Sequence, residues 1–299
     1  MRSLTFPVPQ EYDGLTVGRF LRSHCKASAR LVTRLKQVPM GITANGQHIR
    51  TVDFLHAGDV VVLNIPDDAR PAQPVDLPID VVYEDDDLVV LEKPPFMPVH
   101  PTHGHVDDTL SNAYAAYLAR RGEAAAFRPV NRLDRDTTGL VVVCKNSHSS
   151  SILNGNMDKL YFAVCEGELS GSGTIDAPIR RCEGPGIMRE VGEGGQRCIT
   201  HWEALACDEG MTLLRIRLET GRTHQIRTHF SCCMKMPLVG DDMYGGHCGL
   251  MIRQALHCGQ VSFIHPVTHE PMCINSPLPE DMAALAPCIN YHLEQQKQP

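Results

Sequence analysis

The sequence NRLDRDTTGLVVVCKN, residues 131–146, joins a strongly polar loop to an unbroken apolar run. The apolar run is typical of a buried strand, and a loop held at the end of a rigid strand is where catalytic groups tend to lie. Within the loop, Asp134 lies between Arg132 and Arg135, whose positive charge favours an ionised carboxylate. An ordinary ion-paired loop would have the same composition, so this segment alone leaves both interpretations open.

A second polar segment, ETGRTHQIRTH at residues 219–229, is too rich in polar groups for a core helix. We expect Thr223 to cap a short helix here, with Ile226 facing inward. Arg222 and Arg227 would then be free to bind a phosphate or a carboxylate.

The catalytic half of the chain is predicted to be α+β with much sheet. Apolar or alternating runs predict strands at residues 88–91, 140–144, 160–164 and 214–218. The third of these strands carries Tyr161 among small apolar neighbours, where a core role is the simpler interpretation of this residue taken alone. Thr109 can cap a helix, because the apolar residues that follow it recur at helical spacing.

The first 66 residues differ from the rest of the chain in charge. They hold eight Lys/Arg against four Asp/Glu, a net charge of +4, and since the whole chain has −7, residues 67–299 carry −11. A small polyanion-binding module attached to a larger body would show this asymmetry, although a solvated helical face would show it equally. Apolar spacing predicts two short helices in this region, and Asn45-Gly46 predicts a hairpin after them.

Two basic helices followed by a small sheet that closes with Gly58-Asp59 resemble the S4 RNA-binding module. A basic helix face on a small rigid unit would supply phosphate contacts that do not depend on base sequence. The residues expected to make these contacts are Arg19, Arg22, Lys26, Arg30, Arg34 and Lys36.

Four prolines between Pro66 and Pro78 lie in a stretch that can neither pair in a sheet nor continue a helix. We therefore predict a semi-extended linker at residues 67–79. It would separate an S4-like α/β module at residues 1–66 from a catalytic domain at residues 80–299.

The composition is that of a globular protein. With 299 residues, 42% of them hydrophobic, the chain can bury a substantial core, and neither a secretory signal nor an apolar run of membrane-spanning length is recognisable. A cytoplasmic location is therefore expected, and the 12 scattered cysteines favour free thiols. The histidines and cysteines between His229 and Cys258 raise the alternative of a zinc site, but no Cys-x-x-Cys pair is present and idle thiols are the simpler interpretation.

Five ordered segments resemble the ribosomal large-subunit (RluA-like) pseudouridine synthases over nearly the whole chain. The segments are EKPPFMPVHP (92–101), NRLDRDTTGLVVVCKN (131–146), DKLYFAVCEGEL (158–169), ETGRTHQIRTHFSCCMKMPLVGDDMYGG (219–246) and ALHCGQVSFIHPVT (255–268). The resemblance implies an RNA uridine isomerase with a mixed, mainly antiparallel sheet and with neither metal nor cofactor. Two departures stand out: Asn131 replaces the usual His, and residues 147–158 are rich in Ser, Asn and Gly where relatives tend to have a helix.

The resemblance also implies roles for single residues. Asp134 would be the nucleophile, acting on C1′ of the ribose or through a glycal, and the sequence does not choose between these routes. Arg227 would be its ion-pair partner, and Tyr161 would stack on the base. Arg132 would fill the gap left by the extruded uridine, and Arg222 would bind RNA as well.

The expected partner is RNA, either ribosomal or transfer RNA, and the chain is expected to act as a monomer without an obligate protein partner. A non-catalytic RNA-binding or ribosome-assembly factor that keeps the fold is the alternative from another class. The presence of Asp134, Tyr161 and Arg227 favours the enzyme. The identity of the target uridine is not legible in one sequence, because RNA is recognised largely by shape.

Overall fold

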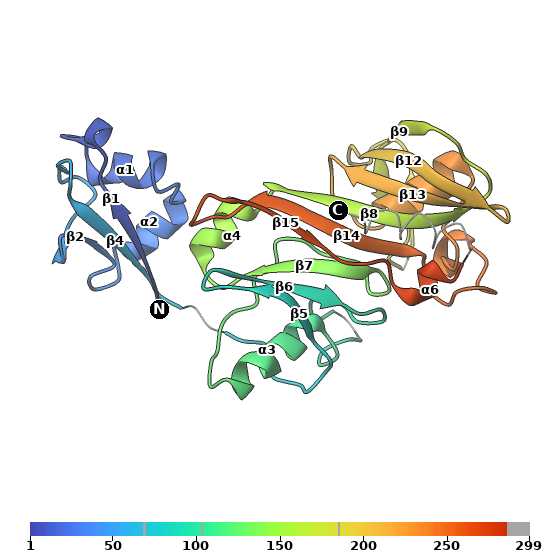
Figure 1. Cartoon of the computed structure of the whole chain (residues 1–299), viewed down its shortest axis with the longest axis horizontal. Helices are drawn as coiled ribbons and strands as arrows, with labels where there is room; N and C mark the ends of the chain where they lie inside the picture. The colour runs from blue at the N-terminus through green and yellow to red at the C-terminus, as the bar shows by residue number, and fades with distance from the viewer. Residues whose placement is uncertain (68–69, 103, 185, 286–299) are drawn as a thin grey trace.

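The computed structural model describes residues 1–67, 70–102, 104–184 and 186–285. The predicted α+β class with a mixed, mainly antiparallel sheet is confirmed: a four-stranded sheet lies near the N-terminus and a nine-stranded sheet fills the rest, with a separate two-stranded ribbon. Figure 1 shows the two larger sheets in two units that lie side by side. Within the described ranges, no helix is both long and apolar enough to cross a membrane.

The N-terminal unit has two helices packed on an antiparallel sheet of order β1-β4-β2-β3. Its elements are β1 (Arg2–Pro7), the 3-10 turn η1 (Gln10–Tyr12), α1 (Val17–Ser23), α2 (Ala29–Leu35), β2 (Ile42–Ala44), β3 (Gln47–His48) and β4 (Val60–Ile65). The two predicted helices and the hairpin are present, and Asn45 and Gly46 have φ of 51° and 79°, as a type I′ turn requires. Strand β1 was missed, because only Leu4 in it is fully buried and its apolar signal is weak.

The larger unit is built on the nine-stranded sheet, whose order is β5-β6-β7-β14-β8-β13-β12-β9 with β15 beside β14. Its strands are β5 (Asp80–Glu84), β6 (Leu88–Lys93), β7 (Thr138–Cys144), β8 (Met157–Glu166), β9 (Ser172–Asp176), β12 (Ile199–Asp208), β13 (Met211–Leu218), β14 (Leu256–Ile264) and β15 (Pro271–Asn275). The ribbon consists of β10 (Ile179–Arg181) and β11 (Arg189–Val191). The helical elements are α3 (Leu110–Arg120), α4 (Ser147–Leu153), α5 (Gln225–Thr228), the π-helical turn η2 (His229–Met234), the 3-10 turn η3 (Asp242–Tyr244) and α6 (Glu280–Ala283).

Strand β7 is an interior strand of this sheet, between β6 and β14, and every one of its residues is buried. It pairs antiparallel with β6 and parallel with β14, where Gly139 lies opposite Cys258. Gly139 has φ of +114°, and a Cβ there would lie 2.3 Å from the carbonyl oxygen of Cys258. Only glycine allows the two backbones to approach this closely, so Gly139 fixes where the polar loop before β7 meets β14.

The segment after β7 corrects one sequence-based expectation. Residues 147–158, expected to lack the helix that relatives have, contain α4, a seven-residue helix. Asn146 caps it, accepting a hydrogen bond from the backbone N–H of Ser149 at 2.9 Å. Serine weakens helix interiors only mildly, and the cap together with burial of Leu153 outweighs that preference.

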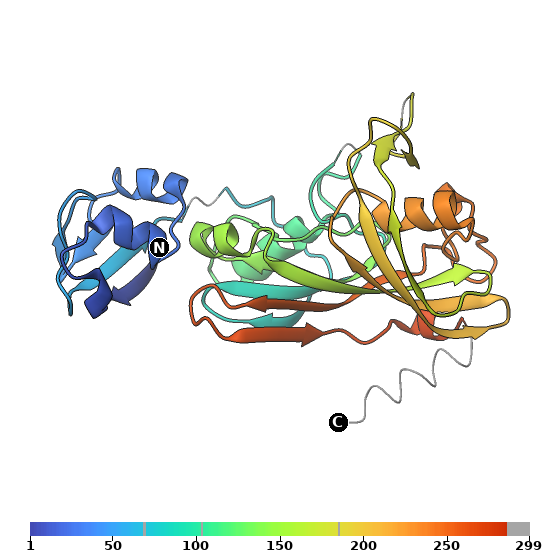
Figure 2. The ribbon, with the colours of Figure 1, turned by 90° about the horizontal axis from the view of Figure 1, so that it is seen from above.

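The two units are joined by more than the chain between them. Arg2 in β1 donates two hydrogen bonds to the buried carboxylate of Asp87, at 3.0 and 2.8 Å. Phe6 packs edge-on against His148 in α4, with ring centroids 6.4 Å apart. Figures 1 and 2 both show α4 at the end of the body that faces the N-terminal unit.

Two buried histidines should make stability depend on pH. Burial lowers the pKa of His148 and of His257 to about 4, from an ordinary value of 6.5. The unfolded chain therefore binds protons between pH 6.5 and 4 that the folded chain does not, so stability present at neutral pH is lost as the pH falls through this window. We expect the free energy of unfolding, measured with urea, to be lower at about pH 5 than at about pH 7.5 by roughly 2 kcal/mol for each residue.

The variant His148→Leu isolates one of these contributions. The Nδ1 atom of His148 is buried without a hydrogen-bond partner, so leucine removes the titrating ring without removing a bond from that atom. The difference in unfolding free energy between the two pH values should shrink by about 2 kcal/mol in this variant. If the variant shows the same difference in unfolding free energy between the two pH values as the native chain, His148 does not contribute to the pH dependence.

Candidate active site

A cavity of about 390 Å³ opens where the loop before β7 meets the segment between β13 and α5. The residues lining it include all five that the sequence singled out in the larger unit: Arg132, Asp134, Tyr161, Arg222 and Arg227. The first two come from one loop, Tyr161 from β8, and the last two from the segment after β13. The structure thus brings together residues that are up to 95 positions apart in the sequence, from 132 to 227.

Arg227 lies at the centre of this cavity's charged groups. Its Nη1 atom is 3.1 Å from Oδ2 of Asp134, and its other nitrogens bind Asp241 at 2.7 and 2.8 Å. The ion pair expected between Arg227 and Asp134 is therefore present. The sequence analysis did not find Asp241, which is almost completely buried and lies in the GDDMYGG part of a quoted segment.

Burial and charge act on Arg227 in opposite directions. Burial has the largest effect and lowers the pKa of its guanidinium, but Asp241 and then Asp134 raise that pKa above the ordinary value. The guanidinium thus keeps its charge in a largely desolvated position. Its charge centre also lies 4.9 Å from the ring centroid of Tyr244, a cation–π contact.

The local backbone that presents Arg227 differs from the expected one. Thr223 does not cap the helix: α5 begins after His224, which has left-handed φ and ψ of 57° and 20°. The side chain of Gln225 holds the turn instead, because its Oε1 accepts from the backbone N–H of Arg222 at 3.1 Å and from the hydroxyl of Thr220 at 2.9 Å. Ile226 is buried, as its spacing predicted.

Tyr161 enters the cavity from the central strand β8 and is only 6% exposed. Burial raises the pKa of its hydroxyl well above the ordinary value, so the phenol is neutral at physiological pH. The ring is thus both a core residue and part of the cavity lining, and the two interpretations of the sequence are compatible.

The loop that carries Asp134 is fixed from both ends. Asn131 is buried, donates to the carbonyl of Leu140 at 2.8 Å and accepts from the N–H of Val142 at 2.9 Å, so it ties the loop to β7. At the position where histidine is usual, Asn131 therefore holds the loop to the backbone of β7, and Asp134 itself is unchanged.

Lys93 holds the other side of the loop, a role that the sequence analysis did not recognise. Its Nζ donates to three carbonyls, those of Pro94, Met97 and Arg135, each at 2.8 Å. Burial lowers the pKa of Lys93 to about 7, against the opposing charges of Asp136 and Asp134. Every hydrogen of the ammonium group has an acceptor, so this geometry favours the protonated form.

The remaining arginines near Asp134 divide into two kinds. Arg135 binds the adjacent Asp136 at 2.7 and 3.0 Å, so it does not pair with Asp134 as its position in the sequence suggested. Arg132 and Arg222 are exposed, and neither guanidinium has a hydrogen-bond or ion-pair partner among the described residues. Unpaired guanidinium groups at a cavity rim are suited to binding phosphate.

His224 is a further cavity residue that sequence reasoning missed. Its Nε2 lies 3.9 Å from Oδ2 of Asp134, and its Nδ1 is 2.9 Å from the Tyr244 hydroxyl, which also accepts from the N–H of Arg189 at 2.8 Å. Burial lowers the pKa of His224, so the ring is neutral. If the hydroxyl donates its one hydrogen to Nδ1, the ring proton sits on Nε2, facing Asp134.

The six basic residues predicted to bind RNA in the N-terminal unit lie on or beside α1 and α2, away from this cavity. All are exposed except Arg34, which is partly buried and donates to the carbonyl of Pro66 at 3.0 Å. Arg34 is thus already engaged with the start of the proline-rich stretch.

The cysteines and histidines that suggested a zinc site do not gather in the part of the chain that the structure describes. His229 binds Thr200, His247 binds Glu166 and His257 binds Thr138, at separate places. Among the described residues, only one group of three possible metal ligands occurs, and it consists of Asp85, Asp87 and His265.

That group is already occupied by protein donors. Asp87 binds Arg2, while Asp85 accepts from the Tyr83 hydroxyl at 2.8 Å and from two backbone N–H groups at 2.7 and 2.9 Å. We therefore interpret these carboxylates as part of the contact between the two units.

Comparison with known proteins agrees with the fold and identifies the family. The model of the RNA pseudouridylate synthase family matches residues 87–232. Bacillus subtilis RNA pseudouridine synthase YjbO is 38% identical over 88% of this chain and 96% of its own length. Ribosomal large subunit pseudouridine synthase D of Xylella fastidiosa is 36% identical over 82% of this chain and 80% of its own.

Solved structures show the same fold at lower identity. Human RNA pseudouridylate synthase domain containing 1 superposes with a TM-score of 0.57, at 23% identity over 71% of this chain and 87% of that one. The chain therefore belongs to the RNA pseudouridine synthase family. Its activity is the isomerisation of uridine to pseudouridine in RNA.

Removing the guanidinium of Arg227 should destabilise the protein as well as inactivate it. In Arg227→Ala, Asp134 and the buried Asp241 would be left without a cation between them, and we expect the free energy of unfolding to fall by about 3–5 kcal/mol. Urea denaturation measures this loss. Arg215→Ala is the matched control, because Arg215 forms a partly exposed pair with Glu203 and should lose only about 0–1 kcal/mol. Equal losses in the two variants would contradict a buried structural role for Arg227.

Proposed function

We propose that this chain isomerises specific uridines in large-subunit ribosomal RNA, with Asp134 as the nucleophile. The observation that carries the proposal is the 3.1 Å pair between Asp134 and Arg227 inside a cavity that Tyr161 also lines. Ribosomal RNA is preferred to transfer RNA as the substrate because several similar relatives bear the name ribosomal large subunit pseudouridine synthase D.

The reaction breaks the N1–C1′ bond of uridine and joins C1′ to C5, while the proton on C5 leaves and N1 gains one. Substrate and product are isomers, so no co-reactant is consumed. The uridine must first leave its stack, at a cost of a few kcal/mol. Arg132, exposed and unpaired at the rim among the described residues, is suited to fill the vacated position in the RNA.

Within the cavity, Arg227 donates a hydrogen bond to the carboxylate of Asp134 and supplies its counter-charge while the entering base excludes water. Asp134 then acts on C1′ directly or through a glycal, and either route requires the negative charge. Tyr161, rigid and neutral, offers a ring on which the detached uracil can turn.

We also propose that residues 1–66 form an S4-like RNA-binding module, that residues 67–79 are a linker and that residues 80–299 form the catalytic domain. The separate hydrophobic core around Phe20, Leu21 and Leu63 supports this division. The chain would act as a monomer in the cytoplasm, where the free thiols of the cysteines in the described ranges would be stable.

Asp134→Asn tests the nucleophile. The amide nearly preserves the shape of the side chain, but it can neither attack C1′ nor act in the route through a glycal. Turnover should therefore fall below about one part in a thousand of the original. RNA affinity, measured by filter binding to large-subunit ribosomal RNA, should change little. Greater residual turnover would count against the assignment.

An RNA containing 5-fluorouridine gives an independent readout. The native chain should form a tight or rearranged adduct with it, and the Asp134→Asn chain should not. A native chain that binds RNA but produces neither adduct nor pseudouridine would instead be a binding or assembly factor.

Neutralising the exposed basic face of the N-terminal module tests its role. Deleting residues 1–66 would leave Asp87 without Arg2, so the full chain is used with Arg19, Arg22, Arg30 and Lys36 replaced by Gln. The slope of log affinity against log salt should become shallower by about 0.7–0.9 for every phosphate that the variant no longer binds. Turnover at saturating RNA should be unchanged, since these contacts are the same in the ground and transition states. Unchanged slopes would mean that this face is merely solvated.

A further inference from the structure

A second cavity, of about 400 Å³, lies beside the catalytic one and has no role in the chemistry described above. The residues lining it are Ile179, Arg180, Arg181, Arg189, Gly194, Gly195, Gln196, Gly221, Arg222 and Thr223. Four of these ten lining residues are arginines, and none of the ten described lining residues is acidic. Gly221, Arg222 and Thr223 line both cavities, so the two adjoin along this segment.

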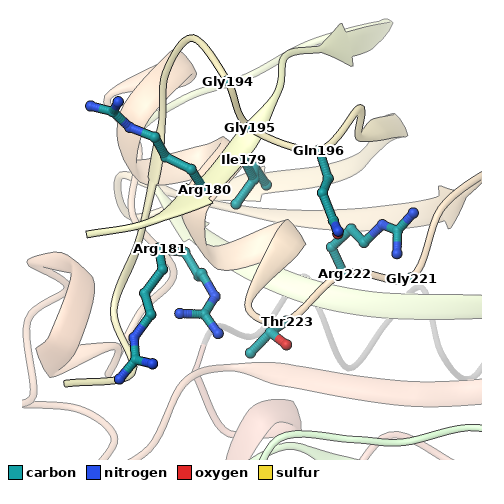
Figure 3. Close-up of a pocket in the computed structure, with 10 residues that line it drawn as sticks. Ile179, Arg180, Arg181, Gly194, Gly195, Gln196, Gly221, Arg222 and Thr223 are labelled. Atoms are coloured by element: carbon teal, nitrogen blue, oxygen red, sulfur yellow. The ribbon is translucent and has the colours of Figure 1, made fainter. Parts of the chain in front are cut away.

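The cavity is built by the ribbon β10–β11 and the loop that follows it. In Figure 2 this hairpin projects from the body of the protein, and Figure 3 shows Arg180 and Arg181 on its strand across from Arg222. A Cβ on Gly195 would lie 2.7 Å from the backbone of Ile179, so the glycine lets the loop pack directly against β10. The wall is therefore a packed structure that positions its side chains.

The arginines of this wall are not neutralised by carboxylates, with one exception. Arg180 pairs with Glu190 at 2.9 Å. Among the described residues, the guanidinium of Arg181 binds only the carbonyl of Gly186, that of Arg189 binds only the carbonyl of Met188, and that of Arg222 has no partner. Three guanidinium groups therefore line one cavity without a counter-charge from the part of the chain that the structure describes.

This concentration of positive charge is unusual in its surroundings. Residues 67–299 carry a net charge of −11, which would repel a polyanion unless positive charge were gathered where the chain must pass. A uridine that enters the catalytic cavity brings a phosphate on each side, so an RNA strand leaving that cavity along Arg222 meets the hairpin arginines next.

We propose that Arg181, Arg189 and Arg222 form a subsite for the RNA backbone phosphates that flank the extruded uridine. The proposal rests on the proposed function, since it assigns the phosphate contacts of that same substrate. Arginine suits the task because its planar group donates two parallel hydrogen bonds to a phosphate. The contact would be the same before and during the reaction, so the subsite contributes affinity rather than chemistry.

The hairpin is also tied to the catalytic centre through its backbone. The N–H of Arg189 donates to the Tyr244 hydroxyl, which contacts His224 beside Asp134. Replacing the side chain of Arg189 leaves this backbone hydrogen bond available, so side-chain variants test phosphate binding without removing that link.

The test compares the native chain with a double variant, Arg181→Gln with Arg189→Gln. Binding to a single-stranded oligouridylate of about 12 nucleotides is measured at several chloride concentrations. The magnitude of the slope of log affinity against log salt should fall by about 0.7 for each phosphate that is no longer bound. Affinity at low salt should weaken roughly tenfold. On the ribosomal RNA substrate, KM should rise by a similar factor with kcat unchanged.

Two controls separate charge from structure. Arg197→Gln removes one exposed arginine that pairs with Asp176 and does not line the cavity, and its slope should match that of the native chain. Arg181→Lys with Arg189→Lys keeps the charge but loses the forked hydrogen bonds within the hairpin, and it should keep most of the slope. If the lysine and glutamine variants lose the slope equally, or if the glutamine variant keeps it, the proposal is overturned.

Free phosphate is the other possible source of the same chemistry. If inorganic phosphate, added at constant ionic strength, raises the melting temperature of the native chain but not of the double variant while the oligouridylate slopes remain equal, the cavity binds free anion and the proposal fails. Because the slopes are measured without turnover, a chain that shows the arginine-dependent slope but makes no pseudouridine would refute the proposed function alone.

Discussion

The candidate active site depends on one buried cation placed between two carboxylates from different parts of the chain. Arg227 contacts Asp134 in the loop before β7 and Asp241 in the loop before η3, and its own side chain is 6% exposed. A buried guanidinium is tolerated only when its hydrogen bonds are satisfied, so each of the three segments is held in place by the other two. The position of Asp134 is thus a property of the folded sheet rather than of its own loop.

The sheet holds the loop with Asp134 in place through two contacts. Gly139 lets β7 lie against the backbone of Cys258 in β14, and Lys93, at the end of β6, binds the carbonyl of Arg135 next to Asp134. A side chain at residue 139 or a missing ammonium at residue 93 would shift the loop that must meet Arg227. The geometry at Asp134 therefore depends on residues that do not line the cavity.

The sequence predicted the elements with strong local signals and missed those defined by tertiary contacts. The polar loop before β7, the apolar strand after it and the Asn45-Gly46 hairpin follow from short-range patterns, and so does the inward face of Ile226. Resemblance, not pattern, paired Arg227 with Asp134. Asp241, His224 and the triple contact of Lys93 carry no local signature, because their roles arise only when distant segments meet. Thr223 was assigned the cap by residue type alone, whereas the side chain of Gln225 organises that turn through bonds to positions three and five residues earlier.

The same residue type does two different tasks in this enzyme, and solvent exposure separates them. At the centre, Arg227 is desolvated and fully paired, so its charge acts on Asp134 with little screening. At the rim, Arg132 and Arg222 are exposed and have no partner among the described residues, so they can exchange water and counterions for a phosphate at small desolvation cost. A body with a net charge of −11 can accept a polyanion only if its unpaired positive charges are gathered where the strand passes. The exposed arginines are therefore suited to contacting the backbone of an RNA strand, whereas the buried Arg227 is suited to holding Asp134 in place.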